Sequence, residues 1–290
     1  MEERAFATRV VRASRLSPTF VRVTVTGDSL ADFAAHGDDQ RINLAFVTDR
    51  EQAAAYDLDE DWYATWQATP VDQRPPLRTY TVRSFRPADV ELDLDFVLHG
   101  DAGPASRFAG AARPGMPLTV CGPVVGHTFP ASADVAWSPP PGPGRLLIAA
   151  DEAAVPAASA IAEALPAGAP ATVVLEVPEP ADAVPFAAPA GVEVVWLARS
   201  RGERLLPVVR EIVTALPRRA AQSPPDDGDE DELWDVPEAL SGVAGGFYAW
   251  LAGEAGAVVA MRRHLVGERG IDRRAVAFMG YWRRGRAQVN

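Results

Sequence analysis

The stretch Leu146-Leu-Ile-Ala-Ala-Asp-Glu-Ala-Ala-Val-Pro156 decides the fold of the second half of the chain. Its first five residues are continuously apolar, which is typical of a strand buried on both faces of a parallel sheet. The alanine-rich stretch 154–165 that follows predicts a helix. A buried strand leading directly into a helix is the repeating unit of a doubly wound sheet, in which ligands bind beyond the carboxyl ends of the strands.

The rest of the second half repeats this alternation. Helices are predicted at 205–216 and 255–266. Short apolar runs, each predicted as a buried strand, lie at 172–177, 192–197, 247–252 and 276–279. We therefore predict that residues 145–290 form an α/β domain with a doubly wound parallel sheet. Its acidic loop at about 220–237 contains too little apolar surface to offset the entropy of ordering, so we expect this loop to be disordered.

The first half has the alternating pattern of antiparallel strands. Along 91–96 the apolar residues Leu92, Leu94 and Phe96 alternate with acidic ones, so we predict that the apolar side chains point inward and the acidic ones outward. Further strands are predicted at 20–25, 42–47, 79–84 and 118–121. We predict that residues 1–136 form an antiparallel β-barrel of six strands. The Pro/Gly-rich segment 137–144 cannot continue a sheet or a helix and is predicted to be the linker between the two domains.

The composition excludes several kinds of chemistry. All 28 cationic residues counted as Lys+Arg are arginine, which excludes a catalytic lysine, a Schiff base and a Walker A loop. The single cysteine, Cys121, excludes an intramolecular disulfide, a Cys-rich zinc site and a protein-held iron–sulfur cluster. No other set of side chains has the spacing of metal ligands, so no protein-held metal is expected.

The charge is distributed unevenly. A formal net charge of −11 over 290 residues argues against a nucleic-acid partner. The segment 262–290, however, holds eight arginines against Glu268 and Asp272, a local charge of +6. A basic tail on an acidic body favours an anionic small molecule or cofactor as partner.

The sequence has no recognisable targeting or membrane segment. The first residues are acidic and no apolar signal region follows them. No run reaches the roughly 18 apolar residues that a membrane span requires. We expect a cytoplasmic monomer that does not insert into membranes.

The first candidate binding motif is Arg78-Thr-Tyr-Thr-Val-Arg83. In a strand, Arg78, Tyr80 and Val82 share one face, and Thr79, Thr81 and Arg83 share the other. A cation and a flat aromatic ring on one face can pair with a phosphate and stack on a planar group. The alternative is an ordinary half-exposed strand.

The second candidate motif is His99-Gly-Asp-Ala-Gly-Pro-Ala-Ser-Arg107. Pro104 suits an early helical position, because its missing N–H costs little there. The free amides at such a helix start can hold a pyrophosphate. The alternative is a glycine-rich turn that binds no ligand.

Together these motifs resemble those of the siderophore-interacting proteins, which are FAD-dependent ferric-siderophore reductases of the ferredoxin–NADP reductase superfamily. Matching segments follow in order at Pro114–Pro123, Asp151–Pro156, Ala249–Glu254 and Gly280–Gly285. The resemblance fails only around 137–144 and 220–237. It implies a FAD-binding barrel followed by a ferredoxin-reductase-like domain for NADPH or NADH.

The resemblance also implies roles for residues of the barrel. Arg78 would pair with the FAD pyrophosphate, Tyr80 would pack on the isoalloxazine, and Thr81 with the Val82 backbone would bond to the polar edge of the flavin. Arg83 belongs to the same implied site, and His99 would line the adenosine or ribityl path. The implied pyrophosphate cap comprises Gly103, Pro104, Ala105 and Ser106. Trp282 would shield the flavin ring.

The implied nucleotide site comprises Asp151, Glu152, Ala153, Gly253, Glu254, Arg199, Ser200 and Arg201. The first turn, Asp151-x-Ala153-x-x-Pro156, departs from the superfamily pattern G-x-G-x-x-P. An arginine pair with a serine at the end of a strand suits a 2′-phosphate, which favours NADPH over NADH. The alternative is a solvated loop at 199–201.

The resemblance implies that chelated Fe(III) is reduced to Fe(II), which its chelator holds less tightly. The protein would contribute positioning and electrostatics, with no acid–base catalyst. The arginines Arg283, Arg284 and Arg286 would dock an anionic ferric siderophore. Three alternatives remain open: reduction of another acceptor such as free flavin or a redox partner, electron supply by ferredoxin, and a non-catalytic carrier of ferric chelates.

Overall fold

The structure is a computed structural model that describes residues 3–48, 51–52, 61–98, 103–126, 134–141, 144–216, 234–235 and 246–285. The chain divides into two compact units, Met1–Val135 and Ala136–Val289, called here unit 1 and unit 2. The acidic loop lies outside the described residues except for Trp234–Asp235, which form a short strand. Among the described residues, no helix is long and apolar enough to cross a membrane.

Unit 1 is built on one antiparallel sheet of seven strands, in the order β4-β3-β7-β1-β2-β6-β5. The strands are β1 (Glu3–Arg15), β2 (Phe20–Thr26), β3 (Arg41–Ala45), β4 (Leu77–Thr81), β5 (Ser84–Arg86), β6 (Glu91–Val97) and β7 (Pro117–Pro123). The unit also holds a 3-10 turn η1 (Asp28–Asp32) and the helices α2 (Trp62–Ala68) and α3 (Pro104–Ala111). Six strands were expected. The sequence placed five of those six, and the observed seven add the long strand β1, which was not predicted, and β5, because the predicted strand 79–84 is two strands.

The interruption of strand 79–84 explains how the sheet curls. β4 and β5 stand at opposite ends of the strand order, yet only Val82 and Arg83 separate them along the chain. The Val82 amide donates to the Gln40 carbonyl at 2.9 Å, next to β3, and the Arg83 amide donates to the Asp93 carbonyl of β6 at 3.0 Å. These two residues therefore pass from one end of the sheet to the other.

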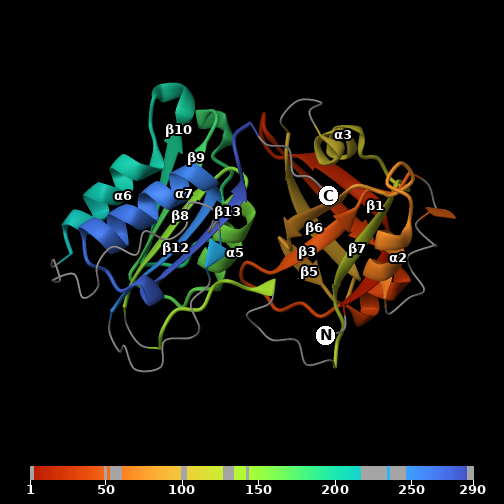
Figure 1. Cartoon of the computed structure of the whole chain (residues 1–290), viewed down its shortest axis with the longest axis horizontal. Helices are drawn as coiled ribbons and strands as arrows, with labels where there is room; N and C mark the ends of the chain where they lie inside the picture. The colour runs from red at the N-terminus through yellow and green to blue at the C-terminus, as the bar shows by residue number, and fades with distance from the viewer. Residues whose placement is uncertain are drawn as a thin grey trace. The chain divides into compact units, whose positions relative to one another are not determined.

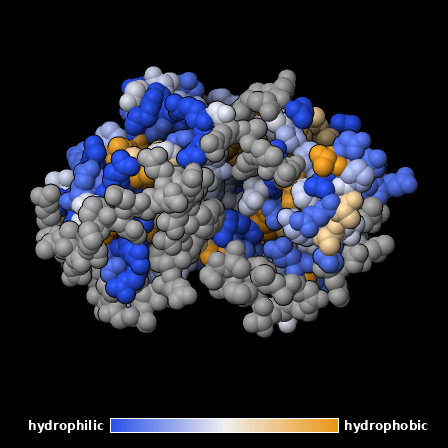
Figure 2. Space-filling model, in the orientation of Figure 1, coloured by the Kyte–Doolittle hydropathy of each residue, from blue (hydrophilic) through white to orange (hydrophobic). Residues whose placement is uncertain are grey.

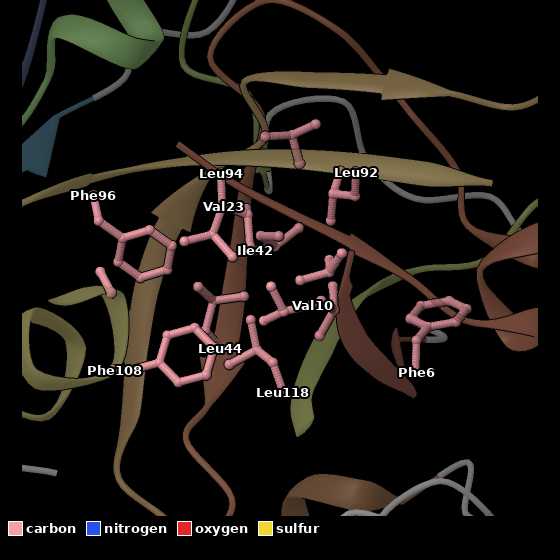
Figure 3. Close-up of a cluster of buried hydrophobic side chains, with 14 of the residues drawn as sticks. Phe6, Val10, Val23, Ile42, Leu44, Leu92, Leu94, Phe96, Phe108 and Leu118 are labelled. Atoms are coloured by element: carbon pink, nitrogen blue, oxygen red, sulfur yellow. The ribbon is translucent and has the colours of Figure 1, made fainter. Parts of the chain in front are cut away.

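The core of unit 1 follows the alternation of β6. Leu92, Leu94 and Phe96 are fully buried, as predicted, and Phe96 and Phe108 lie at one end of the hydrophobic cluster (Figure 3). The acidic residues point outward, as predicted, but Asp93 and Asp95 are only 5% and 9% exposed. Arginines from neighbouring strands cover them.

Those arginines form a network on the outer face of the sheet. Arg22 of β2 binds Asp95 with two hydrogen bonds of 2.7 and 2.8 Å. Arg86 of β5 binds Asp93 at 2.6 and 2.9 Å. Although burial acts to raise it, the hydrogen bonds from Arg86 and Thr24 hold the pKa of Asp93 below its ordinary value. Asp93 therefore serves as an ionised pairing partner within the sheet.

Unit 2 contains a doubly wound sheet, as predicted. Its strand order is β10-β9-β8-β12-β13-β11, parallel except for β11. The strands are β8 (Arg145–Asp151), β9 (Ala171–Val177), β10 (Val192–Ala198), β11 (Trp234–Asp235), β12 (Phe247–Glu254) and β13 (Val276–Trp282). The order changes direction at β8, so the switch point lies between the carboxyl ends of β8 and β12.

Helices cover both faces of this sheet. Figure 1 shows α6 (Leu205–Thr214) and α7 (Ala255–Arg262) on one face and α5 (Val155–Ala164) on the other. The unit also contains 3-10 turns η2 (Pro180–Asp182), η3 (Arg199–Arg201) and η5 (Arg273–Ala275). The predicted helix 255–266 instead changes after Arg262 into a π-helix, η4 (Arg263–Glu268).

The described surface in the view of Figure 2 is largely hydrophilic, with hydrophobic residues showing only in small separate areas. The large hydrophobic side chains that are exposed among the described residues are Tyr63, Val71 and Val125. No extended apolar surface therefore marks a docking face in this view.

Candidate FAD and nucleotide sites

Unit 1 holds the first motif on β4. Arg78 and Tyr80 are half-buried and lie opposite Leu44 and Ile42 of β3. The Tyr80 ring packs on the core, with its centroid 4.6 Å from that of Phe96. Burial raises the pKa of the Tyr80 hydroxyl and lowers the pKa of the Arg78 guanidinium. Tyr80 is therefore neutral at physiological pH, and Arg78 is a partly desolvated cation, which strengthens its attraction for an anion.

The end of the same motif has a structural role. The Arg83 Nε lies 3.8 Å from Asp95 Oδ2, which makes Arg83 part of the network that covers β6. Thr81 and Val82 are buried, and the Val82 amide is already bonded to Gln40. The structure thus separates Arg78 and Tyr80 from Arg83, which lies beyond the strand break.

The second motif begins helix α3, as predicted. Gly103 precedes the helix, Pro104 occupies its first turn, and no side chain caps it. The first intrahelical bond runs from the Arg107 amide to the Gly103 carbonyl at 3.1 Å, and the Ser106 hydroxyl donates to Val97 at 3.3 Å. A β-carbon at Gly103 would meet no atom within 4 Å, so the helix start has open space beside it.

One aromatic cluster anchors both motifs. Phe108 of α3 packs on Phe96, with ring centroids 6.0 Å apart, and Phe96 in turn contacts Tyr80. The helix that carries the uncapped amides and the strand that carries Arg78 are therefore fixed on the same core residue. His99, another residue of the predicted FAD site, lies outside the described residues.

The donor set of unit 1 suits FAD. The first turn of α3 contains no acidic residue, and its amides precede the hydrogen-bonded part of the helix. Amides at a helix start together with an arginine are the groups that bind a pyrophosphate. Tyr80 adds an aromatic ring on the face of Arg78. These residues would hold the pyrophosphate and flank the flavin.

In unit 2, Asp151 lies at the switch point as the last residue of β8. Its buried carboxylate accepts N–H groups from Ala153 at 3.0 Å, from Glu254 at 2.6 Å, and from the indole of Trp282 at 2.8 Å. Burial and the neighbouring charge of Glu152 raise the pKa of Asp151 to about 7, although the three donors act to lower it. The turn therefore carries a carboxyl group that titrates near neutral pH.

The next acid, Glu152, binds Arg199. The Arg199 Nη1 donates to Glu152 at 2.6 Å and to Glu176 at 3.3 Å, and its Nη2 donates to Glu152 as well. Burial acts against it, but these hydrogen bonds raise the pKa of Arg199. Arg199, a predicted nucleotide ligand, is thus placed between two carboxylates of its own chain.

The first turn offers few amides to a phosphate. The Ala153 amide is bonded to the Asp151 side chain and the Ala154 amide to the Asp151 carbonyl, at 2.9 Å. Pro156 has no N–H. The departure from the glycine-rich pattern therefore has a structural consequence, because anionic groups of a nucleotide would need positive side chains elsewhere in unit 2.

Such a side chain lies on η3, at the carboxyl end of β10. Ser200 and Arg201 are exposed, and within the described part of the chain their side chains have no hydrogen-bond or ion-pair partner. Their neighbours brace the turn: Glu203 accepts the Ala198 amide at 2.6 Å, and Arg204 donates to the Arg199 carbonyl at 3.0 Å. The turn is fixed while Ser200 and Arg201 remain available.

The basic tail follows β13. Glu254, at the end of β12, accepts hydrogen bonds from the Ala257 amide at 2.9 Å and from the Arg284 amide at 3.3 Å. Its carboxylate therefore caps the start of α7 and also binds the backbone of the basic tail. Arg283 is half-buried and Arg284 is exposed. Arg286 lies outside the described residues.

Two histidines each bind a carboxylate. His36 lies 2.7 Å from Asp134, and His264 lies 2.6 Å from Glu268. Within the described ranges, no group of three or more His, Cys, Asp or Glu side chains could hold a metal ion.

Glu176 belongs to this site but was not predicted from the sequence. It is the only acid in the apolar run 172–177, its side chain is 10% exposed, and it accepts both Arg199 and the Leu205 amide, the latter at 2.8 Å. A lone carboxylate in a buried strand requires a partner. That signal was present in the sequence, but the identity of the partner was not.

Comparison with known families identifies the chain. Residues 9–127 match the siderophore-interacting FAD-binding domain, and residues 143–285 match the siderophore-interacting protein family. The chain belongs to the siderophore-interacting protein family. Unit 1 accordingly contains its FAD-binding domain.

Two of the proteins similar to this chain are named as reductases. The ferric vibriobactin reductase of Vibrio cholerae is 29% identical over 95% of this chain and 88% of its own length. The NADPH-dependent ferric-chelate reductase of Escherichia coli is 35% identical over 39% of this chain and 42% of its own length. The crystal structure of a siderophore-interacting protein from Aeromonas hydrophila matches with a TM-score of 0.68 and 30% identity, covering 99% of this chain and 94% of that one.

Proposed function

We propose that this siderophore-interacting protein is an NADPH-dependent ferric-siderophore reductase that binds FAD in unit 1. The observation that carries the proposal is the pairing of two donor sets in a single chain. Unit 1 has Arg78 and the free amides of the α3 start, which suit a pyrophosphate, and unit 2 has Ser200 and Arg201 exposed at the carboxyl end of β10. The names of the ferric vibriobactin and ferric-chelate reductases among its relatives agree with this assignment.

When bound, FAD supplies the conversion of a two-electron donor into the single-electron transfers that Fe(III) accepts. Arg78 and the first turn of α3 bind its pyrophosphate. Tyr80, held on Phe96 with ring centroids 4.6 Å apart, presents an aromatic edge beside Arg78. The protein adds orientation and charge, and no side chain of the site is required as an acid–base catalyst, because the reduction of Fe(III) transfers an electron and no proton.

Unit 2 selects the electron donor. Arg199 is committed to Glu152 and Glu176, so the 2′-phosphate of NADPH would bind Ser200 and Arg201. Arg199 thus positions the turn η3, and Ser200 and Arg201 recognise the phosphate. This division of roles supports NADPH over NADH.

The substrate is an anionic ferric chelate. Arg284 is exposed, and its amide bond to Glu254 fixes the tail near the end of β12. Arg283 and Arg284 would attract the negative charge of a ferric catecholate, with Arg286 following them in the sequence. The reaction would release iron, because hard oxygen chelators bind Fe(II) less tightly than Fe(III). We propose that this release takes place in the cytoplasm.

The experiment is an anaerobic iron-release assay in which Fe(II) is trapped by a chromogenic chelator. NADPH, the FAD-loaded protein and a ferric tricatecholate should yield Fe(II), and omission of either NADPH or protein should abolish it. Arg284→Glu should lower kcat/KM for this anionic chelate about tenfold at low ionic strength, with a smaller loss in high salt. A neutral ferric trihydroxamate is the matched substrate control. Failure to release iron from both chelates would contradict the proposal.

A further inference from the structure

Asp151 and Trp282 connect two strands that are not neighbours in the sheet. Asp151 ends β8, Trp282 ends β13, and β12 lies between them. The indole Nε1 nevertheless donates to Asp151 Oδ2 at 2.8 Å. Asp151 is buried and Trp282 is half-buried, so the indole N–H is anchored on a buried carboxylate while the residue Trp282 keeps some exposed surface.

Gly253 makes this contact possible. It lies on β12 between the two residues, has a φ of +143°, and a β-carbon at its position would come 2.5 Å from the Asp151 carboxyl carbon. The pairing of β12 with β13 also shifts register between Gly253 and Glu254. The carboxylate therefore occupies the space that a side chain would fill, and it reaches across β12 to the indole.

Asp151 binds the backbone on both sides of this space. Its Oδ2 also accepts the Glu254 amide at 2.6 Å, and its Oδ1 accepts the Ala153 amide at 3.0 Å. The carboxylate is thus fixed by the first turn after β8 and by the end of β12. Because these backbone amides fix the Asp151 carboxylate, its hydrogen bond to the Trp282 indole fixes the orientation of the indole.

We propose that Asp151 is a positioning residue that holds the Trp282 ring across the switch point of unit 2, so that the ring is a fixed wall of the nicotinamide-nucleotide site. This inference rests on the proposed function, because it assumes that unit 2 binds a nicotinamide nucleotide. It differs from the role that the sequence suggested for Trp282, a cover over the flavin. Ligands of doubly wound sheets bind at the switch point, and this is where the ring is anchored.

The hydrogen bond can be observed directly by NMR. The chain has seven tryptophans, so a ¹⁵N-labelled sample gives few enough indole signals to assign Trp282 by its loss in Trp282→Phe. The Trp282 indole N–H should exchange slowly with solvent. In Asp151→Ala the signal should shift and exchange at least tenfold faster. A Trp282 signal that exchanges rapidly in the wild-type protein would overturn the inference.

The functional consequence is measured with NADP⁺ as the probe, by equilibrium binding to the FAD-loaded protein. Trp282→Phe keeps an aromatic ring but removes the N–H donor, so its dissociation constant for NADP⁺ should rise about tenfold. The KM for NADPH should rise by a similar factor with kcat nearly unchanged, and the flavin content should stay the same. Trp196→Phe is the matched control, because Trp196 is half-buried on β10 of the same sheet and its indole N–H has no partner among the described residues.

The outcomes separate the two proposals. Equal NADP⁺ affinity in Trp282→Phe and wild type would overturn the positioning role and leave the proposed function intact. Wild-type protein that binds neither NADP⁺ nor NAD⁺ would overturn both the proposed electron donor and the role of the Trp282 ring as a wall of the nucleotide site. The exchange rate of the Trp282 indole N–H would still show whether its hydrogen bond to Asp151 forms. Flavin loss in Trp282→Phe with unchanged NADP⁺ affinity would restore the flavin-cover role and contradict the inference.

Discussion

A β-carbon at Gly253 would lie 2.5 Å from the carboxyl carbon of Asp151. This proximity joins the ends of β8 and β12 at the point where the strand order of unit 2 changes direction. The backbone of Gly253 also has a φ of +143°, a conformation that residues with a side chain rarely adopt. The switch point thus depends on one residue without a side chain.

Gly253→Ala is accordingly expected to destabilise unit 2 by about 3 kcal/mol, through backbone strain and displacement of Asp151. Chemical denaturation followed by tryptophan fluorescence measures the loss. Gly267→Ala is the matched control, since a β-carbon there meets nothing within 4 Å and the residue lies in the helical segment η4. Equal stability of the two variants would contradict the role of Gly253.

Arg78→Ala should weaken FAD binding without unfolding unit 1. A charge-assisted contact with a phosphate contributes about 2 kcal/mol, so the dissociation constant for FAD should rise about thirtyfold. The measurement is flavin titration of the apoprotein by fluorescence quenching. Arg113→Ala removes a cation from the exposed turn before β7 and should leave affinity unchanged. An unchanged affinity in Arg78→Ala would remove Arg78 from the FAD site.

Arg201→Ala should change nucleotide selectivity. Loss of a 2′-phosphate contact raises the KM for NADPH about tenfold or more and leaves the KM for NADH unchanged. Arg210→Ala, on the exposed part of α6, should alter neither constant. Arg199→Ala should instead lower the melting temperature, because it leaves the 3%-exposed Glu152 side chain without its cation. If Arg199→Ala alone changed selectivity, the assignment of roles on η3 would be reversed.

The Arg86–Asp93 pair predicts a pH-dependent stability. The pKa of Asp93 is lowered in the folded state, so the folded protein binds fewer protons than the unfolded chain. Its stabilisation is therefore present above about pH 4 and is lost as the pH falls through the folded-state pKa. Arg86→Met should cost about 2–3 kcal/mol at pH 7, and the deficit should shrink toward pH 3.

The matched control for Arg86→Met is Arg274→Met. Arg274 forms an exposed pair with Asp272, and such surface pairs contribute little. Urea unfolding at several pH values measures both variants. A deficit in Arg86→Met that stayed constant with pH would contradict the assignment of Asp93 as an ionised partner.

Local pattern was sufficient to predict much of this fold. Continuous apolar runs gave the parallel strands of unit 2, and the alternation of Leu92, Leu94 and Phe96 gave the inner face of β6. The strand β1 was missed because its buried positions are few and its register shifts between Val10 and Arg12. The strand break at Val82 depends on bonds to Gln40 and Asp93, which are distant in sequence.

The site was predicted less completely for the same physical reason. The residue types of η3 suggested a phosphate site, but only the fold brings Glu152, 47 residues away in the sequence, to Arg199. Likewise, Asp151 and Trp282 were each assigned to a site, yet their hydrogen bond spans 131 residues. The order of the strands in the sheet decides which distant residues become hydrogen-bond partners, and a short sequence motif does not contain that order.

The central claim, that this chain passes electrons from NADPH through FAD to a ferric siderophore, is tested most directly by an anaerobic spectral titration of the purified holoprotein. The account predicts a flavin absorption spectrum that NADPH bleaches and that a ferric siderophore then restores, with Fe(II) formed. Bleaching without restoration by any ferric chelate would point to another acceptor. A flavin that neither NADPH nor NADH bleaches would contradict the account and favour ferredoxin as donor or a non-catalytic carrier.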